Sequence, residues 1–162
     1  MQLQHKLSEE LTLFKSLCFA YKTTQKSSFR YRTVIGVGGN IGDVKRRFHH
    51  LFHFLKKETQ VELLQTSSLL KNPPFGFKDQ DDFYNGLIVL QTSMQPLKLL
   101  RYLHRVEKKF GRKRSFPNAP RSLDLDIIFF DNRVIKSDKL QIPHVDWFNR
   151  KSVVIPLMDL VI

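Results

Sequence analysis

The chain has 162 residues, about one domain's worth, and its hydrophobic and charged shares of 41% and 26% are ordinary for a globular protein. No apolar run reaches the roughly 18 residues that a membrane-spanning helix needs, no signal peptide is evident, and the single cysteine, Cys18, excludes an internal disulfide. We therefore expect a cytoplasmic protein without a membrane partner. The net charge of +12 predicts attraction to phosphate groups, which nucleotides and nucleic acid both carry.

The first 31 residues are predicted to be an appendage. Apolar residues recur at three- and four-residue spacing from Leu3 to Tyr21, which is typical of an amphipathic helix. The polar stretch from Lys22 to Ser28 that follows has the composition of a linker. We expect a helical extension and linker over residues 1–31 and a folded domain over residues 32–162. The pattern leaves open whether the helix packs on the domain or binds a partner.

The folded domain is predicted to alternate strands and helices. A β-prone run from Thr33 to Val37 ends at Gly38-Gly39-Asn40, and amphipathic helical patterns cover about 42–57 and 96–110. The paired prolines at 73 and 74 indicate a loop, because proline resists ladder pairing. Further strand candidates are residues 61–70, 83–91, 122–130, 140–142 and 152–155. The order predicts an α+β fold, a ferredoxin-like α/β/α sandwich with a central, mostly antiparallel sheet.

Two carboxylates lie two residues apart in the last long strand candidate. Asp124 and Asp126 would share one face of a strand, with Leu123, Leu125 and Ile127 turned to the core. Like charges so placed repel each other unless a cation lies between them, and magnesium accepts one or two carboxylates together with phosphate oxygens. A solvated acidic face is the alternative for this pattern by itself.

A basic loop directly precedes this strand and favours the magnesium interpretation. The stretch from Lys108 to Leu123 contains six basic residues, no acid, and turn-forming glycine, proline and asparagine. Arginines and metal-binding carboxylates converge where triphosphates bind. The sequence therefore predicts a magnesium–nucleotide site and an enzyme that acts on a phosphate donor.

The ordered motifs resemble a known family. The run from Asn118 to Ile128, Asn-Ala-Pro-Arg-Ser-Leu-Asp-Leu-Asp-Ile-Ile, is similar to the signature of 6-hydroxymethyl-7,8-dihydropterin pyrophosphokinase, an enzyme of folate synthesis. The resemblance extends from about Val34 to Leu157 through the glycine–asparagine turn, the Asn72-Pro73-Pro74 loop and Pro143-His144. It implies two magnesium ions and transfer of the β,γ-pyrophosphate of ATP to the pterin hydroxymethyl oxygen, with release of AMP.

The resemblance also implies roles for individual residues. The magnesium ligands would be Asp124 and Asp126, and the catalytic set would add Arg112 and Arg121. The ATP-binding residues would be His104, Glu107, Arg112, Arg114, Arg121, Ile127, Lys139, His144 and Arg150. The pterin-binding residues would be Asn72, Pro73, Phe75, Phe83 and Asn85, because a flat heterocycle needs aromatic stacking and a few polar groups at its edge.

Several residues have structural interpretations beside the functional ones. Glu107 could belong to a solvated helix face, and His144 could be a loop histidine bonded to backbone. Phe75, Phe77 and Phe83 have the pattern of ordinary core residues when the resemblance is set aside.

The chain also departs from the family pattern. Gly39 stands where serine is usual, Asn72 replaces a threonine, and an aromatic residue expected near Ser152 is missing.

Two other functions remain as alternatives. An RNA-binding module would use a ferredoxin-like sheet with an aromatic face, and Gly39-Asn40-Ile41-Gly42 is superficially a G-x-x-G loop. That loop follows a strand and contains no basic residue, and two carboxylates would repel a phosphate backbone. A non-catalytic relative would not need to keep Arg121, Asp124 and Asp126. We therefore expect small-molecule substrates, no nucleic-acid partner and a monomer.

Overall fold

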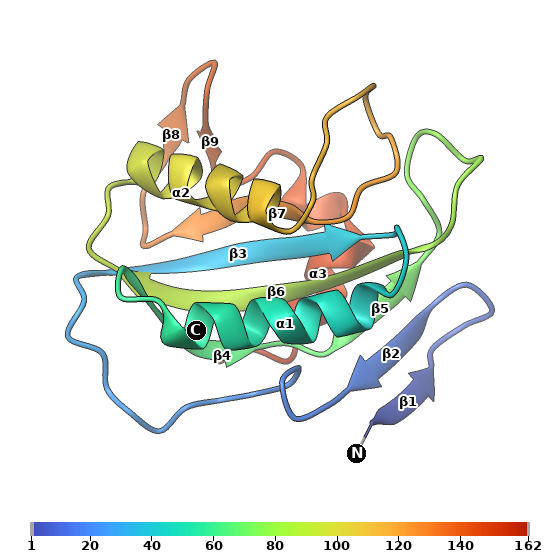
Figure 1. The fold of residues 1–162 in the computed structure, drawn as a ribbon, viewed down its shortest axis with the longest axis horizontal. Coiled ribbons are helices and arrows are strands. Elements are labelled where there is room, and N and C mark those ends of the chain that lie inside the picture. Colours follow the sequence, from blue (N-terminus) through green and yellow to red (C-terminus); the bar gives the residue numbers. More distant parts are fainter. Residues whose placement is uncertain (1, 162) are drawn as a thin grey trace.

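A seven-stranded antiparallel sheet forms the centre of the molecule in the computed structural model, which describes residues 2–161 (Figure 1). Its strands are β1 (Leu3–Lys6), β2 (Thr12–Lys15), β3 (Tyr31–Gly39), β4 (Val61–Thr66), β5 (Leu69–Asn72), β6 (Phe83–Thr92) and β7 (Asp124–Phe130). They are ordered β1-β2-β5-β6-β3-β7, and β4 pairs with the part of β6 that β5 leaves free. Two short strands, β8 (Ile135–Lys136) and β9 (Gln141–Ile142), form a separate hairpin.

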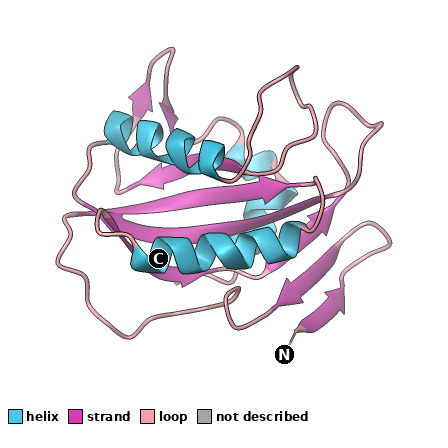
Figure 2. Ribbon diagram, in the orientation of Figure 1, coloured by secondary structure: helices cyan, strands magenta, loops and turns pink. Residues whose placement is uncertain are grey.

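Helices cover both faces of the sheet (Figure 2). The helices α1 (Val44–Lys57) and α2 (Pro96–Lys109) lie on one face, and α3 (Lys151–Leu157), preceded by a 3-10 turn at Trp147–Asn149, lies on the other. This arrangement confirms the predicted α+β class and the α/β/α sandwich. None of the helices within residues 2–161 is long and apolar enough to cross a membrane.

The two main helices begin where the sequence provides capping groups. The Asp43 side chain accepts a hydrogen bond from the Arg46 backbone N–H at 3.2 Å, and Pro96 occupies the first turn of α2, where a missing N–H costs nothing. The apolar stripe of α1 is buried through Phe48, Leu51 and Leu55. The main core therefore lies between α1, α2 and the sheet, and a smaller core around Leu87 and Val153 lies under α3.

The prediction of an N-terminal helix is wrong. Residues 3–6 and 12–15 form the β1–β2 hairpin, and β2 pairs with β5. The apolar residues have the spacing of a helix, but their side chains do not share one buried face. Leu3, Leu7 and Leu17 are 60%, 42% and 82% exposed, whereas Phe14 and Phe19 are buried. The boundary between the predicted segments 1–31 and 32–162 stays a prediction. Their first and last residues, 1 and 162, lie outside the described residues.

Two other elements differ from expectation. Residues 152–155 belong to α3 and not to a strand, because Val153 and Pro156, three positions apart, both bury against the sheet. The run from 61 to 70 is two strands, because Ser67 interrupts the ladder: its backbone N–H donates to Leu87 O at 2.9 Å and its hydroxyl accepts from Leu87 N–H at 2.8 Å. Local β propensity favoured single strands in both places, and tertiary packing decided otherwise.

Candidate active site

Asp124 and Asp126 lie on one face of β7, as the alternation predicted. Leu125 and Ile127 between and beyond them are buried in the main core on the opposite face. In the ladder with β3, Asp124 is paired with Gly38 and Asp126 with Gly36. The two carboxylates therefore face a stretch of the neighbouring strand that has no side chains on that side.

The glycines of β3 leave a cleft between the carboxylates and the amides of β6. A Cβ atom on Gly38 would lie 2.7 Å from Oδ1 of Asn85, and one on Gly36 would lie 3.1 Å from the end of the Ile128 side chain. Asn85 is the ladder partner of Gly38 from the other side. The cleft is thus floored by backbone, with carboxylates on one wall and the Asn85 amide on the other.

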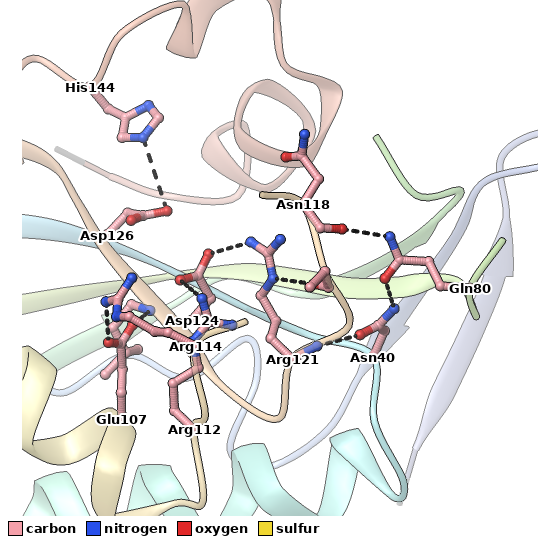
Figure 3. A network of polar contacts seen from close by, with 12 residues as sticks. Asn40, Gln80, Glu107, Arg112, Arg114, Asn118, Arg121, Asp124, Asp126 and His144 are labelled. Carbon is pink, nitrogen blue, oxygen red and sulfur yellow. Dashed lines mark hydrogen bonds and ion pairs between the residues drawn. The ribbon is translucent and has the colours of Figure 1, made fainter. Parts of the chain in front are cut away.

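Two arginines of the basic loop converge on Asp124 (Figure 3). Nη1 of Arg121 lies 3.1 Å from Oδ2 of Asp124, and Nη2 of Arg112 lies 3.8 Å from Oδ1. Both arginine side chains are mostly buried, and the Nε atom of Arg112 has no hydrogen-bond partner within the described residues. The wall of the cleft therefore holds two cations of fixed charge next to one carboxylate.

Asp126 faces the cleft, with 44% of its side chain exposed against 21% for Asp124. Desolvation of this carboxylate within the cleft, followed by the neighbouring carboxylates of Asp124 and Glu107, raises the pKa of Asp126, and Arg150 and Arg121 oppose this shift. Nε2 of His144 lies 4.0 Å from its Oδ2. A carboxylate so placed is stabilised in its charged form when a cation joins the site.

His144 reaches the cleft as the family resemblance implies. Its Nδ1 also lies 2.9 Å from the carbonyl oxygen of Val145, so the backbone-bonded interpretation is correct for one ring nitrogen and the other faces Asp126. Burial and the positive charge of Arg150 lower the pKa of His144.

Glu107 is buried below the strand, so the solvated-face interpretation is wrong. Only 2% of it is exposed, and its Oε2 accepts a hydrogen bond from the Leu125 backbone N–H at 2.8 Å. Its Oε1 lies 3.2 Å from Nη2 of Arg114. Burial raises the pKa of Glu107 to about 7. The hydrogen bond from Leu125 and the charges of Arg114 and Arg112 lower this pKa and oppose the shift only in part. Glu107 of α2 therefore contacts both the basic loop, through Arg114, and the strand that carries the two aspartates, through Leu125.

The opposite wall comes from β5 and β6. Asn72 is paired in the ladder with Phe83, and the Asn85 side-chain amide donates to Oδ1 of Asn72 at 2.7 Å. The Arg121 guanidinium lies 5.3 Å from the centre of the Phe83 ring. Phe83 is buried, whereas Phe75 and Phe77 are 77% and 39% exposed, so the core interpretation is wrong for these two. The cleft is therefore lined by one exposed ring, Phe75, and one buried ring, Phe83.

A polar network that the sequence did not predict joins the loops around the cleft (Figure 3). The Asn40 amide donates to Oε1 of Gln80 at 2.8 Å, and its Oδ1 accepts from the Arg121 backbone N–H at 2.9 Å. Gln80 in turn donates to the carbonyl oxygen of Asn118 at 2.8 Å. Asn40 lies in the glycine–asparagine turn of the family resemblance, which was its only sequence signal.

The structure brings most of the predicted residues to one cleft. Its lining includes Asn72, Phe75, Phe83, Asn85, Arg121, Asp124, Asp126, His144 and Arg150. Arg112 and Arg114 join it through their contacts with Asp124 and Glu107. Glu107 also lies outside the lining and joins it only through its contacts with Arg114 and Leu125. The other predicted residues that do not line the cleft are Pro73, His104, Ile127 and Lys139. Ile127 is buried on the other face of β7, and Lys139 is exposed between β8 and β9. Gly36, Gly38, Asn118, Ile128, Ser152 and Val153 line the cleft without having been predicted.

The donor set fits magnesium better than a transition metal. Within residues 2–161, no three histidine, cysteine, aspartate or glutamate side chains gather as a metal site. Zinc and similar ions need three or four protein ligands, whereas magnesium binds through one or two carboxylates and completes its shell with water and phosphate oxygens. The carboxylates of Asp124 and Asp126 therefore suit magnesium bound together with a polyphosphate.

Comparison with known proteins shows one family among the relatives of this chain. The family model described as 7,8-dihydro-6-hydroxymethylpterin-pyrophosphokinase (HPPK) matches residues 34–162. A 2-amino-4-hydroxy-6-hydroxymethyldihydropteridine pyrophosphokinase from Campylobacter jejuni is 41% identical over 143 residues, which are 88% of this chain and 91% of the relative. Proteins of the same name from Helicobacter pylori and Haemophilus influenzae are 35% and 36% identical over 82% and 78% of the chain, and 83% and 79% of their own lengths.

Proposed function

Since the chain belongs to the 7,8-dihydro-6-hydroxymethylpterin-pyrophosphokinase family, we propose that its cleft is where pyrophosphate passes from ATP to 6-hydroxymethyl-7,8-dihydropterin. The chain is a pyrophosphokinase of folate biosynthesis, a transferase that uses ATP as co-substrate. The β- and γ-phosphates move together to the hydroxymethyl oxygen, and AMP leaves.

One observation carries the assignment of the cleft. The carboxylates of β7 and the amides of β5 and β6 face each other across the side-chain-free part of β3 at Gly36 and Gly38. A triphosphate bound at the carboxylates and a heterocycle bound at the amides would therefore meet over this floor. Holding the two substrates next to each other removes the entropy cost of bringing them together. Such positioning supplies a large part of catalysis in phosphoryl transfer.

We assign the metal site to Asp124 and Asp126, which would hold two magnesium ions. These ions would neutralise the triphosphate and stabilise the charge that develops on its oxygens during transfer. The proximity of the two carboxylates supports the assignment, because their mutual repulsion, which Arg150 and Arg121 oppose only in part, favours a bound metal cation.

The arginines would bind the triphosphate. Arg121 is held beside Asp124 by its backbone and side-chain hydrogen bonds and would contact the ground-state nucleotide. Arg112, whose Nε lacks a partner, would act mainly during transfer, when charge spreads over the equatorial oxygens. Further ATP contacts are proposed for His104, Glu107, Arg114, Ile127, Lys139, His144 and Arg150. For Glu107 and Ile127, which are buried, the contact would be indirect or through backbone.

The pterin would bind at the opposite wall. Phe83 and Phe75 supply ring faces for stacking, and the amides of Asn72 and Asn85 supply donors and acceptors for the edge of the heterocycle. Pro73 would shape the loop next to Asn72. The Asn72 side-chain amide donates a hydrogen bond to the Pro73 carbonyl oxygen at 3.0 Å.

The protein is further proposed to work as a cytoplasmic monomer without a nucleic-acid partner. The carboxylates, arginines and amides assigned to the two substrates line one cleft within a single chain, which is compatible with a monomer. The single cysteine, which is buried, fits a reducing compartment.

The direct test is to incubate the protein with magnesium, ATP and 6-hydroxymethyl-7,8-dihydropterin and to identify the nucleotide product. AMP is expected, in a one-to-one ratio with the pterin pyrophosphate. Formation of ADP would show transfer of one phosphate and would refute the proposed reaction, and the absence of any product would favour a non-catalytic relative.

A further inference from the structure

The N-terminal hairpin lies outside the matched family domain and yet contributes to the central sheet. The family match begins at residue 34, whereas β1 and β2 end at Lys6 and Lys15. In Figure 1 the hairpin lies alongside β5, and three residues of β2, Thr12, Leu13 and Phe14, pair with residues 69–71. The hairpin thus covers the edge of the short strand whose last residue is Asn72.

Phe14 connects the hairpin to the back of the proposed pterin wall. Its ring is 92% buried and lies 5.7 Å, centre to centre, from the ring of Tyr84. The Lys45 ammonium lies 4.2 Å from the centre of the Phe14 ring and 5.7 Å from that of Tyr84. The two rings are tilted by 53° to each other, and together with the cation they form one cluster, which we call the Phe14 stack.

Tyr84 occupies the position between two residues assigned to the pterin. Successive side chains of a strand point to opposite faces, so Phe83 and Asn85 face the cleft while Tyr84 faces the α1 side. The β3 ladder partner of Tyr84 is Gly39, which offers no side chain for the ring to pack on. On the other side, the ladder partner of Tyr84 is Lys71 of β5. Within the main core, the aromatic contact of Tyr84 is with Phe14, so the Phe14 stack contributes to the support of this stretch of β6 from the α1 side.

The rest of the N-terminal segment anchors this support. Phe19 is fully buried against Phe48, His49 and Phe52 of α1. The Tyr21 backbone also exchanges hydrogen bonds with Thr66, at 2.8 and 3.0 Å. The hairpin is thus held at a fixed distance from α1 and from β5.

We propose that the N-terminal hairpin is a positioning element for the pterin wall, acting through Phe14 and Tyr84 on β5 and β6. This inference rests on the proposed pterin role of Asn72, Phe83 and Asn85. Small displacements of binding groups cost large factors in binding and rate, so a loosened wall would weaken pterin binding selectively. The proposed nucleotide wall on β7 lies on the other side of β3, and within residues 2–161 β7 does not pair with either strand of the hairpin.

The test compares Phe14→Ala with Leu17→Ala, a matched control three residues away whose side chain is 82% exposed. For Phe14→Ala we expect a rise of about tenfold in KM for the dihydropterin and less than about twofold in KM for ATP. Leu17→Ala should leave both constants unchanged. Equilibrium binding of 6-hydroxymethylpterin in the presence of magnesium and a non-hydrolysable ATP analogue should show the same loss.

Tyr84→Ala provides a second variant if Phe14→Ala does not fold, because the Tyr84 ring is only half-buried. It should produce the same division between the two KM values. An unchanged dihydropterin KM in a folded variant, or equal rises in both KM values, would overturn the inference.

Asn72→Ala separates this inference from the proposed function. If Asn72→Ala raises the dihydropterin KM and the stack variants do not, the hairpin inference fails and the pterin site stands. If Asn72→Ala has no effect while the wild type releases AMP normally, the pterin assignment itself is wrong, and the inference falls with it.

Discussion

Replacing Gly38 with alanine tests the geometry of the cleft floor most sharply. The new Cβ atom would lie 2.7 Å from Oδ1 of Asn85, well inside van der Waals contact. The Asn85 amide is the end of a side chain, so it can rotate away at small cost to the fold. Its 2.7 Å hydrogen bond to Asn72 would then break, and both amides would lose the orientation proposed for reading the pterin.

The size of the effect follows from two lost interactions, the Asn72–Asn85 hydrogen bond and one hydrogen bond to the pterin. A neutral hydrogen bond contributes about 0.5–1.5 kcal/mol, and about 1.4 kcal/mol corresponds to a tenfold change in binding. Loss of the Asn72–Asn85 bond and of one pterin contact should therefore raise the dihydropterin KM about 10- to 100-fold. The free energy of unfolding should fall by only about 1 kcal/mol.

A double-mutant cycle with Asn85→Ala provides the control. Both single variants should raise the dihydropterin KM, measured by AMP release at saturating ATP. Once the Asn85 amide is absent, the alanine at position 38 has nothing to displace, so the double variant should resemble Asn85→Ala alone. Additive effects, or a folded Gly38→Ala variant with a normal dihydropterin KM, would refute the reasoning.

Three further variants probe the site and the core. Asp126→Ala should abolish AMP release while circular dichroism shows an intact fold; normal turnover would contradict the metal assignment. Arg112→Ala should lower kcat by about 100-fold or more and change the Kd for ATP much less, since its proposed role is in transfer; a loss confined to ATP affinity would be evidence against that role. Tyr102→Phe removes a 2.7 Å hydrogen bond from the Tyr102 hydroxyl to Glu58 and should cost about 1–2 kcal/mol in urea unfolding at pH 7. Burial and Glu58 raise the pKa of Tyr102, so its contribution should be complete below about pH 10 and be lost at higher pH; a wild-type advantage that persists or grows above pH 10 would show that the phenol is not the cause.

The sequence predicted the elements whose pattern is strong and whose partners are near. The helix from Val44 to Lys57 has a regular apolar stripe and an aspartate cap, and the strand from Asp124 to Phe130 has a clear alternation. In such segments local preference and tertiary packing agree, so the pattern alone is sufficient. The two carboxylates on one strand face followed directly from that alternation.

Segments with weaker patterns were decided by distant partners. Thr12–Lys15 is a strand because the edge of β5 offers backbone hydrogen bonds that a helix in this place could not use. Residues 152–155 are helical because a helix here packs Val153 against the apolar side chains of Leu87 and Ile128 on this face of the sheet. Glu107 shows the same principle for a single residue, since the helical pattern could not reveal that the Leu125 N–H would meet its carboxylate inside the protein.

By itself, then, the sequence determined the class of fold and the position of Asp124 and Asp126 on one strand face behind a run of arginines, from which the magnesium–nucleotide site is predicted. These features lie within a few residues of one another, where spacing and charge are readable directly. Only the tertiary structure decided how that wall faces Asn72 and Asn85 across Gly38, because the distance between strands depends on ladder pairing between residues far apart in the chain. For the same reason, the contact of Phe14 with Tyr84, behind the proposed pterin wall, became visible only when β2 was placed beside β5.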